Sequence, residues 1–309
     1  MKTITIVTPV FNEIDTLDFY FKKINEEISK IKNYSFKILI IDNCSTDGTV
    51  EYLKKIANKN KDLQLILNNK NYGHIKSHYY ALTQTNTDAS ILIYADLQDP
   101  PKLIYSFIKK WEEGFKLVLG IKKASKENFF LFQARKIFYK LINLLSDDHL
   151  IENYNGFGLY DNKILKILSN YNEPLPYFRG LISEIGYKKS LVYYNQNKRK
   201  YGSTNNNFFT LFDLSIIALV NHTKLLIRIM TISGLFLSII FFLIGNYYLI
   251  LKIFNWNSFT LGIAPLVVGL LFSMSFILFF VGIIGEYIYS INEKLKNKPL
   301  VIEEERINI

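Results

Sequence analysis

The first 120 residues alternate short apolar runs with amphipathic segments, and this alternation restricts the fold more than any other feature of the chain. Five of the runs are rich in β-branched residues: TITIVTPV, FKILIID, LQLILN, SILIYAD and KLVLGI. Short runs that are apolar throughout are typical of strands buried on both faces, as in a parallel sheet. This part of the chain therefore predicts a buried sheet with helices between its strands.

The intervening segments have helical periodicity. In the first of them, apolar residues recur every three or four positions, at Ile14, Leu17, Phe21, Ile24, Ile28 and Ile31. This stripe predicts a helix that packs on the sheet, with Asn12 or Asp15 as its N-cap. A second helix is expected after Ser45 or Thr46, and a third is expected to end at Gly114. The order predicts an α/β fold with a doubly wound sheet and right-handed crossovers.

The pattern becomes less regular after residue 120. The segment NYNGFGLYD, at 153–161, is expected to be a glycine-punctuated loop or a short strand. Residues 208–222 have apolar side chains at helical spacing and predict either an interfacial helix on a bilayer or an ordinary packing helix. The expected organisation is a cytoplasmic domain at 1–205, a juxtamembrane helix at 206–224, two membrane helices at 225–290 and a cytoplasmic tail at 291–309.

Two nearly uncharged apolar stretches, Ile229–Leu251 and Leu261–Ile284, have the length needed to cross a hydrocarbon core. Basic residues flank the pair on its outer sides, whereas the connecting loop holds only Lys252. The positive-inside rule therefore predicts a multi-pass protein of the bacterial inner membrane, with the domain and both termini in the cytoplasm. A buried hairpin of a soluble protein is the alternative.

Composition excludes several classes of site. The single cysteine, Cys44, rules out a disulfide framework, and the four histidines lack metal-ligand spacing. The net charge of +10 favours an anionic partner, but no nucleic-acid motif accompanies it. The basic run Lys198–Lys200 is either a phosphate contact or an ordinary solvated face.

Polar patches follow three of the predicted strands: TPVFNE, IDNCSTDGT and YADLQDPP. In an open α/β sheet, the carboxyl ends of the strands form the edge where ligands bind. One acidic residue after a strand is often only a helix cap, but three such patches in order predict a binding site.

These patches resemble those of the family-2 glycosyltransferases with the GT-A (Rossmann-like) fold. Among these, the chain is similar to the polyprenyl-phosphate glycosyltransferases, such as dolichol-phosphate mannose synthase and the bacterial bactoprenol glucosyltransferases. The resemblance continues through NNKNYGHIKSHYYAL, ADLQDPP, FRGLISEIGY and the R-x-x-G of Arg199–Gly202, and ends with the paired apolar stretches. It covers nearly the whole chain.

The resemblance implies a nucleotide-sugar donor and roles for individual residues. Pro9, Phe11 and Glu13 would line the nucleotide pocket, with Ala95 also in contact with the nucleotide. Asp42 would hold the base or the ribose. The resemblance also allows a homo-oligomer, and it implies no nucleic-acid partner.

The same resemblance implies a divalent cation, Mg²⁺ or Mn²⁺, that would bridge the donor diphosphate. Asp96 would hold this cation, and Gln98 would add an oxygen ligand. Arg199, and with it Lys122, would neutralise phosphate. A hard cation and basic side chains both stabilise the charge that develops on a diphosphate leaving group. Asp99 is the nearest carboxylate that could act as a base, but it could equally cap the following helix.

The chain departs from the family pattern at three positions. The D-x-D motif reads Tyr94-Ala95-Asp96, Asn43 replaces the second aspartate of D-D-x-S-x-D-G, and glycines replace the charged pair of the D-F-R segment. Loss of the first carboxylate is expected to weaken a metal site or to shift it onto substrate phosphates.

The leading interpretation is an inverting glycosyltransferase that moves a sugar to polyprenyl phosphate, undecaprenyl phosphate in a bacterium, for envelope glycan or lipopolysaccharide modification. One alternative is a non-processive transferase acting on a glycan or lipid-linked oligosaccharide. The other, motivated by Tyr94, is a membrane-anchored nucleotide-sugar-binding scaffold without full catalytic activity.

Overall fold

The computed structural model describes residues 1–123, 151–171, 173–174, 176–197, 225–254, 263–296 and 298–309. The expected juxtamembrane helix at 206–224 and the expected phosphate contact Arg199 lie outside these residues. The strands that are described are β1 (Lys2–Val10), β2 (Tyr34–Asp42), β3 (Leu63–Asn68), β4 (Ala89–Leu92), β5 (Leu117–Lys122), β6 (Tyr154–Asp161), β7 (Lys189–Tyr194) and β8 (Glu303–Ile307). The helices are α1 (Ile14–Ile28), α2 (Thr49–Ala57), α3 (His74–Thr83), α4 (Leu103–Glu112), α6 (Asn162–Ser169), α7 (Phe178–Glu184), α9 (Leu225–Phe254) and α10 (Ile263–Leu295).

Within the described residues, the strands form one eight-stranded sheet in the order β7-β5-β6-β4-β1-β2-β3-β8. The part β3-β2-β1-β4 is parallel, in the order of a doubly wound sheet, as the alternation predicted. The sheet as a whole is mixed, because β6 pairs antiparallel with β4 and with β5, and β8 pairs antiparallel with β3. The predicted α/β class is therefore confirmed, with a mixed sheet.

Helices cover both faces of the sheet. One apolar core lies between the sheet and α1, α2 and α4, and its largest buried side chains include Tyr20 and Phe107. The other core lies under α3, α6 and α7 and includes Tyr79 and Phe178. Burial of the strands on both faces explains why their sequences are apolar throughout.

The segment 153–161, expected as a loop or short strand, forms β6 in the interior of the sheet, between β4 and β5. Its glycines are required by close packing. A Cβ added at Gly158 would lie 2.5 Å from the carbonyl oxygen of Val118 on β5. The glycines that replace the family's charged pair therefore allow a strand to pass close to its neighbour.

Two helix starts differ from the prediction. The N-cap of α1 is Glu13, and the N-cap of α2 is Gly48, which has a φ of +93°. Asn12, Ser45 and Thr46 instead bond to neighbouring loops, and Asp15 lies within α1. The predicted end of α4 is confirmed, because Gly114 follows the helix with a φ of +99°.

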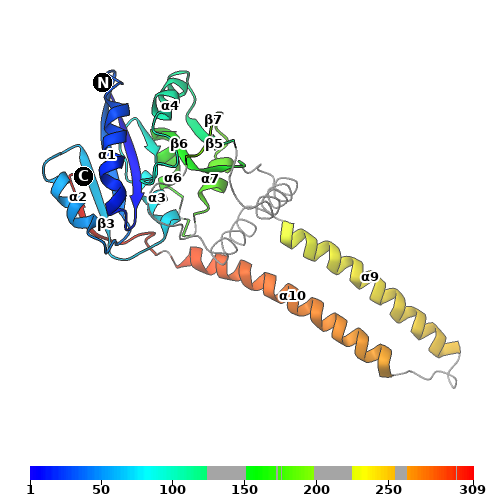
Figure 1. Ribbon diagram of the computed structural model, residues 1–309. Coiled ribbons are helices and arrows are strands. Elements are labelled where there is room, and N and C mark those ends of the chain that lie inside the picture. Colours follow the sequence, from blue (N-terminus) through cyan, green and yellow to red (C-terminus); the bar gives the residue numbers. More distant parts are fainter. Residues whose placement is uncertain (124–150, 172, 175, 198–224, 255–262, 297) are drawn as a thin grey trace.

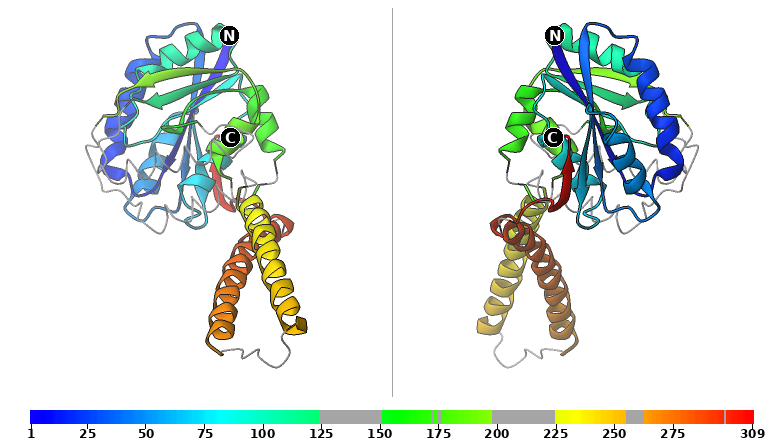
Figure 2. Two further views of the ribbon diagram at one scale, coloured as in Figure 1. Left: turned by 90° about the vertical axis from the view of Figure 1, so that its right-hand side faces the viewer. Right: turned by 90° about the vertical axis from the view of Figure 1, so that its left-hand side faces the viewer.

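The long helices α9 and α10 project from one side of the domain (Figures 1 and 2). Among the described residues, one stretch, Phe272–Leu295 of α10, is long and apolar enough to cross a membrane, and its most apolar part is not buried in protein. The apolar part of α9, Ile229–Ile244, is shorter. One of the two expected membrane spans thus has the composition that the prediction requires.

The residues after α10 return to the domain. The sequence predicted a cytoplasmic tail at 291–309, but α10 continues to Leu295 and Glu303–Ile307 forms β8 at the edge of the sheet. Asn308 holds this end in place, because its Nδ2 donates to the carbonyl oxygens of Ala57 at 2.9 Å and Leu63 at 2.9 Å. The end of the chain is therefore part of the folded domain.

Candidate active site

The carboxyl ends of the parallel strands lie at the edge of the domain that faces α9 and α10. Strand β1 begins at the far end of the domain and runs toward these helices (Figure 1). At this edge, Lys294 Nζ, near the end of α10, lies 3.1 Å from Oε2 of Glu173 in the domain. The three polar patches that follow β1, β2 and β4 are thus close to the apolar helices.

Hydrogen bonds join the loops that follow β1 and β2. Ser45 Oγ accepts a bond from Asn12 N at 2.8 Å, and Asn12 Oδ1 accepts one from Thr46 N at 2.8 Å. Asp47 Oδ2 accepts a bond from Ile14 N at 3.1 Å, which satisfies an amide at the start of α1. Asn12 has a φ of +53°, a conformation that asparagine tolerates well. The polar residues of these two patches therefore shape each other's loops.

The predicted nucleotide contact Asp42 lies at the base of these loops and is only 1% exposed. Both of its carboxylate oxygens accept bonds from Ser45, one from the amide at 2.9 Å and one from the hydroxyl at 2.5 Å. Burial raises the pKa of Asp42, and the bonds from Ser45 oppose that effect. Pro9 and Phe11 are half-buried at the same edge, at the end of β1.

Glu13 supplies a second set of contacts in the first patch. Its amide donates to Thr49 Oγ1 at 3.1 Å, and its Oε2 accepts a bond from Thr16 Oγ1 at 2.7 Å. Lys122 ends β5 at the same edge, where its amide donates to Asn153 O at 3.2 Å. Both side chains are half-buried. The structure thus brings the described nucleotide and phosphate candidates to one edge.

Asn43, the residue that replaces an aspartate of the family motif, is the centre of a buried network. It is 4% exposed, and its Oδ1 accepts bonds from Asn68 Nδ2, Tyr72 N and Ser77 Oγ at 2.9–3.0 Å. Its Nδ2 donates to Asn71 Oδ1 at 2.7 Å. An aspartate could not make this donation when ionised. The departure from the motif therefore has a local reason, since Asn43 joins β2 to the loop before α3.

The third patch, after β4, forms a tight turn. Asp96 Oδ1 accepts a bond from the amide of Gln98 at 3.1 Å, and the intervening Leu97 has a φ of +51°. The Oε1 of Gln98, which the sequence suggested as a metal ligand, accepts a bond from Gln196 Nε2 at 2.8 Å. Ala95 is buried, so its side chain belongs to the core. A nucleotide could reach Ala95 only through its backbone.

Asp99 is neither a helix cap nor an exposed base. The N-cap of α4 is Lys102, and Asp99 is only 1% exposed. Its Oδ2 accepts a bond from Asn155 Nδ2 at 2.7 Å, and its Oδ1 accepts a bond from the hydroxyl of Tyr194. The carboxylate thus connects the turn after β4 with β6 and β7. The helix-cap alternative for Asp99 is therefore wrong, and its role as a base stays a prediction.

Tyr94 occupies the position of the missing carboxylate. Its hydroxyl donates to the carbonyl oxygen of Asn155 at 2.9 Å. Burial raises the pKa of Tyr94, and the nearby charge of Asp99 raises it further. The phenol is therefore neutral near pH 7 and cannot replace an anionic metal ligand.

The expected divalent cation fits these residues poorly. Mg²⁺ and Mn²⁺ prefer several oxygen ligands, with carboxylates among them. Among the described residues, no group of three or more Asp, Glu, His or Cys side chains could hold a metal. Asp96 is the one carboxylate of this turn that is not enclosed, because Asp99 is buried against its two partners.

His78 lies beside Tyr94, and the sequence predicted no role for it. The rings of His78 and Tyr94 are 6.3 Å apart, and the ring of Phe178, next to Arg179, lies 5.3 Å from His78. Burial lowers the pKa of His78 to about 3, so its ring is neutral and Nδ1 donates to the carbonyl oxygen of His74 at 2.7 Å.

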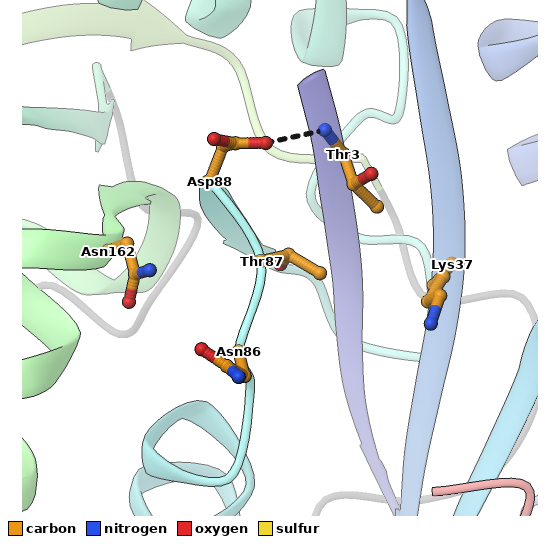
Figure 3. Close-up of a pocket in the computed structure, with 6 residues that line it drawn as sticks. All are labelled: Thr3, Lys37, Asn86, Thr87, Asp88 and Asn162. Carbon is orange, nitrogen blue, oxygen red and sulfur yellow. Dashed lines mark hydrogen bonds between the residues drawn. The ribbon is translucent and has the colours of Figure 1, made fainter. Parts of the chain in front are cut away.

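A polar hollow also exists at the opposite edge of the sheet (Figure 3). It lies near the start of β1 and β4, where Asp88 Oδ2 accepts a bond from Thr3 N at 2.7 Å. The hollow is lined by Thr3, Lys37, Asn86, Thr87, Asp88 and Asn162. None of the predicted site residues belongs to it, so it is separate from the candidate site.

Comparison with known proteins identifies the family. Residues 5–168 match the model of "Glycosyl transferase family 2". The chain is 29% identical over 306 residues to the "Uncharacterized glycosyltransferase YkcC" of Bacillus subtilis, which covers 99% of this chain and 94% of that protein. It is 28% identical over 304 residues to the "Bactoprenol glucosyl transferase" of Shigella phage SfX, and the matched region covers 98% of this chain and 99% of that protein.

Among solved structures, mannosyl-3-phosphoglycerate synthase from Rubrobacter xylanophilus is similar with a TM-score of 0.49, at 17% identity and 75% coverage of each chain. The match to the family model spans more than half of the 309 residues. The protein is therefore a glycosyltransferase that belongs to glycosyl transferase family 2.

Proposed function

We propose that the protein transfers a sugar, with inversion, from a nucleotide-sugar donor to a membrane polyprenyl phosphate, undecaprenyl phosphate in a bacterium. The observation that carries this proposal is the position of the candidate site, which lies at the edge of the sheet nearest the apolar helices α9 and α10. The full-length similarity to a bactoprenol glucosyl transferase supports a lipid acceptor. The product would supply envelope glycan or lipopolysaccharide modification.

The chemistry of this acceptor agrees with the geometry of the site. A phosphate oxygen of the lipid attacks the anomeric carbon, the bond from that carbon to the donor diphosphate breaks, and the nucleoside diphosphate leaves with the electron pair. A phosphate monoester is mostly ionised near pH 7, because its second pKa is about 6. The nucleophile therefore needs no general base, which is consistent with the enclosed position of Asp99.

The topology of the chain supports two membrane crossings. Strands β1 and β8 belong to the same sheet, so the chain must leave the domain and return to it on the same side of a membrane. If α10 crosses the bilayer, α9 must cross it in the opposite direction. The basic flanks support a topology in which the domain and both termini are on the cytoplasmic side of the bacterial inner membrane.

Roles of individual residues follow from their places at this edge. Pro9, Phe11, Glu13 and Asp42 would contact the nucleotide, as would the backbone of Ala95. Asp96 would face the diphosphate, and Lys122 would neutralise phosphate. Arg199 lies outside the described residues, and the resemblance alone proposes the same role for it. A bound Mg²⁺ or Mn²⁺ would depend mainly on oxygens of the donor phosphates, because Asp96 and Gln98 would be its ligands from this chain and Gln98 Oε1 already accepts a bond from Gln196.

The proposed function is tested with the full-length protein in nanodiscs that contain undecaprenyl phosphate. Labelled nucleotide sugars are added one at a time, with and without Mn²⁺, and the lipid fraction is analysed by mass spectrometry. One donor is expected to yield a lipid-linked monosaccharide, and Asp96→Asn is expected to reduce the yield at least tenfold. The exposed Asp62→Asn variant, with the same change in charge, is expected to behave like the wild type.

Two results would contradict the proposal. If no donor gives a lipid-linked sugar, the polyprenyl phosphate is not the acceptor. If a sugar is instead added to a glycan or to a lipid-linked oligosaccharide supplied in parallel, the protein is the related non-processive transferase.

A further inference from the structure

The chain that leaves α10 returns to the candidate edge over a short distance. Helix α10 ends at Leu295, and the carbonyl oxygen of Ile302 already accepts a bond from the amide of Asn69 at 3.1 Å. A chain of this length spans at most about 25 Å, even when it is fully extended. The end of α10 therefore cannot lie farther than that from the loop that follows β3. The other connection between the domain and the apolar helices, from Asn197 to Leu225, is much longer in sequence.

Residues 300–308, which we call the C-terminal clasp, fix this end of the chain to the domain (Figure 2). Val301 is only 4% exposed, and β8 pairs antiparallel with β3. Arg306 Nη2 donates to Oε1 of Gln84, the C-cap residue of α3, at 2.6 Å. The side chain of Asn308 donates to three backbone carbonyl groups. The clasp is therefore attached to the domain along its whole length.

The clasp meets the candidate site at Asn69. The residue before it, Asn68, is 2% exposed and donates from Nδ2 to Asn43 Oδ1 at 3.0 Å and to Ser77 Oγ at 3.2 Å. The thiol of Cys44 donates to the carbonyl oxygen of Asn69, with 3.9 Å between sulfur and oxygen. Asn69 thus bonds to the clasp through its amide and to the loop after β2 through its carbonyl group. The attachment of α10 is therefore one residue away from the buried network that shapes this part of the site.

An ion pair forms a second attachment, between α10 and the segment that follows α6. Lys294 Nζ lies 3.1 Å from Oε2 of Glu173, whose side chain is 15% exposed. The other oxygen of this carboxylate, Oε1, is buried and has no hydrogen-bond partner among the described residues. Such an oxygen costs free energy, so the counter-charge of Lys294 matters more here than at an exposed pair. Two attachments at different elements fix an orientation of the domain on α10 that one attachment could not fix.

We propose that the C-terminal clasp and the ion pair between Lys294 and Glu173 hold the candidate edge in position over the bilayer surface, so that a lipid phosphate reaches the bound donor. The inference rests on the proposed function, because it concerns the acceptor of that reaction. The acceptor is confined to the membrane, and a fixed height and orientation of the site raise its effective concentration there. The donor arrives from solution, so its binding does not depend on this orientation. Lys294 and Glu173 are thus positioning residues.

Steady-state kinetics of the full-length protein with two acceptors test the inference. Undecaprenyl phosphate is supplied in nanodiscs at increasing mole fractions, and a short-chain, water-soluble prenyl phosphate is supplied in solution. Lys294→Glu places two carboxylates against each other and is expected to raise the KM for the nanodisc acceptor at least fivefold. The KM for the soluble acceptor, and the affinity for UDP or GDP measured by calorimetry, are expected to stay within twofold of the wild-type values.

Further variants separate positioning from a general effect of charge or folding. The charge swap, Glu173→Lys with Lys294→Glu, restores the ion pair and is expected to bring the KM for the nanodisc acceptor to within twofold of the wild type. The exposed Lys298→Glu makes the same change of charge just beyond α10 and is expected to behave like the wild type. Asn308→Ala weakens the clasp without a change of charge and is expected to raise the same KM at least twofold. Circular dichroism and the melting temperature show whether each variant is folded.

The inference is overturned if folded Lys294→Glu keeps the wild-type KM for the nanodisc acceptor, or if its nucleotide affinity falls by the same factor as that KM rises. It is also overturned if the folded charge swap does not restore the KM. If the swap does not fold, Asn308→Ala decides, and a wild-type KM for the nanodisc acceptor in this variant rejects the inference.

The wild type separates the inference from the proposed function. Transfer to the nanodisc acceptor by the wild type keeps the function in each of these cases. Absence of transfer to both acceptors by the wild type would reject the function itself, and the inference with it.

Discussion

The two halves of the candidate edge are held together in different ways. At the ends of β1, β2 and β3, short polar side chains bond to nearby backbone amides, as Ser45 does with Asn12 and Asn43 does with Tyr72. At the ends of β4, β6 and β7, a buried carboxylate, Asp99, joins residues that are 56 and 95 positions away in the sequence. The first half is a set of interlocked loops, and the second is a buried polar junction.

The difference explains where the family pattern is retained and where it is lost. In the first half, the motif residues shape the loops themselves, and Asn43 adds a donation to Asn71 that an ionised aspartate could not make. In the second half, Tyr94 and Asn155 use their polar groups within the junction. The second half is expected to be more sensitive to single substitutions, because its central acceptor is a buried carboxylate and hydrogen bonds to a charged group contribute more than bonds between neutral groups.

The largest effect is expected for Asp99→Ala. It leaves the amide of Asn155 and the hydroxyl of Tyr194 without an acceptor, and should lower the free energy of unfolding by about 3 kcal/mol. The melting temperature of the solubilised protein measures this loss. The exposed Asp62→Ala is the matched control. A loss below about 1 kcal/mol for Asp99→Ala would show that the junction is not the more sensitive half.

Asn43→Asp, in the first half, should lower the free energy of unfolding by a smaller amount. It places a carboxylate against Asn71 Oδ1, which now accepts a bond at 2.7 Å, and should cost about 2 kcal/mol at pH 7.5. The deficit should shrink as the pH falls, because a protonated aspartate can donate again. Melting curves at pH 7.5 and 5 would measure both effects, with the exposed Asn60→Asp as control. A deficit that grows on acidification would contradict this account.

His78 packs against Tyr94 of the second half, and it should make the stability of the protein depend on pH. Its pKa is about 3 in the folded state, below its value of about 6.5 when unfolded, so protonation favours the unfolded chain. The stabilising contribution is present above pH 6.5 and is lost as the pH falls, by between about 1 and 2 kcal/mol at pH 5. His78→Gln should remove this part of the pH dependence. An unchanged slope between pH 7.5 and 5 would exclude His78 as its source.

The smallest effect is expected outside both halves, at the exposed ion pair between Lys54 and Glu305, where Nζ and Oε2 are 2.5 Å apart. Glu305→Gln should change the free energy of unfolding by no more than about 0.5 kcal/mol.

Asn308→Ala removes hydrogen bonds to buried carbonyl groups at the same edge of the sheet, and it should lower the free energy of unfolding by about 1 kcal/mol. If the ion pair proved the stronger of the two, attachment of β8 would be mainly electrostatic, and added salt would weaken it.

Much of the fold could be predicted because its signals are local. The apolar runs and the helical stripes follow from the spacing of residues that are neighbours in the sequence, and they correctly predicted the parallel part of the sheet and its helical layers. The polar patches correctly identified the residues that gather at the carboxyl edge. The N-caps of α1 and α2 could not be predicted as well, because Asn12 and Ser45 bond to each other's loops instead.

The sequence by itself determined the alternating elements, the patches that follow the strands, and the apolar helices, since each depends on spacing over one element. Only the tertiary structure decided that β6 lies between β4 and β5, that β8 returns to the sheet, and that Asp99 is enclosed by Asn155 and Tyr194. These features depend on contacts between residues far apart in the chain. Local periodicity specifies which face of an element is buried, but it does not specify which distant partner covers that face.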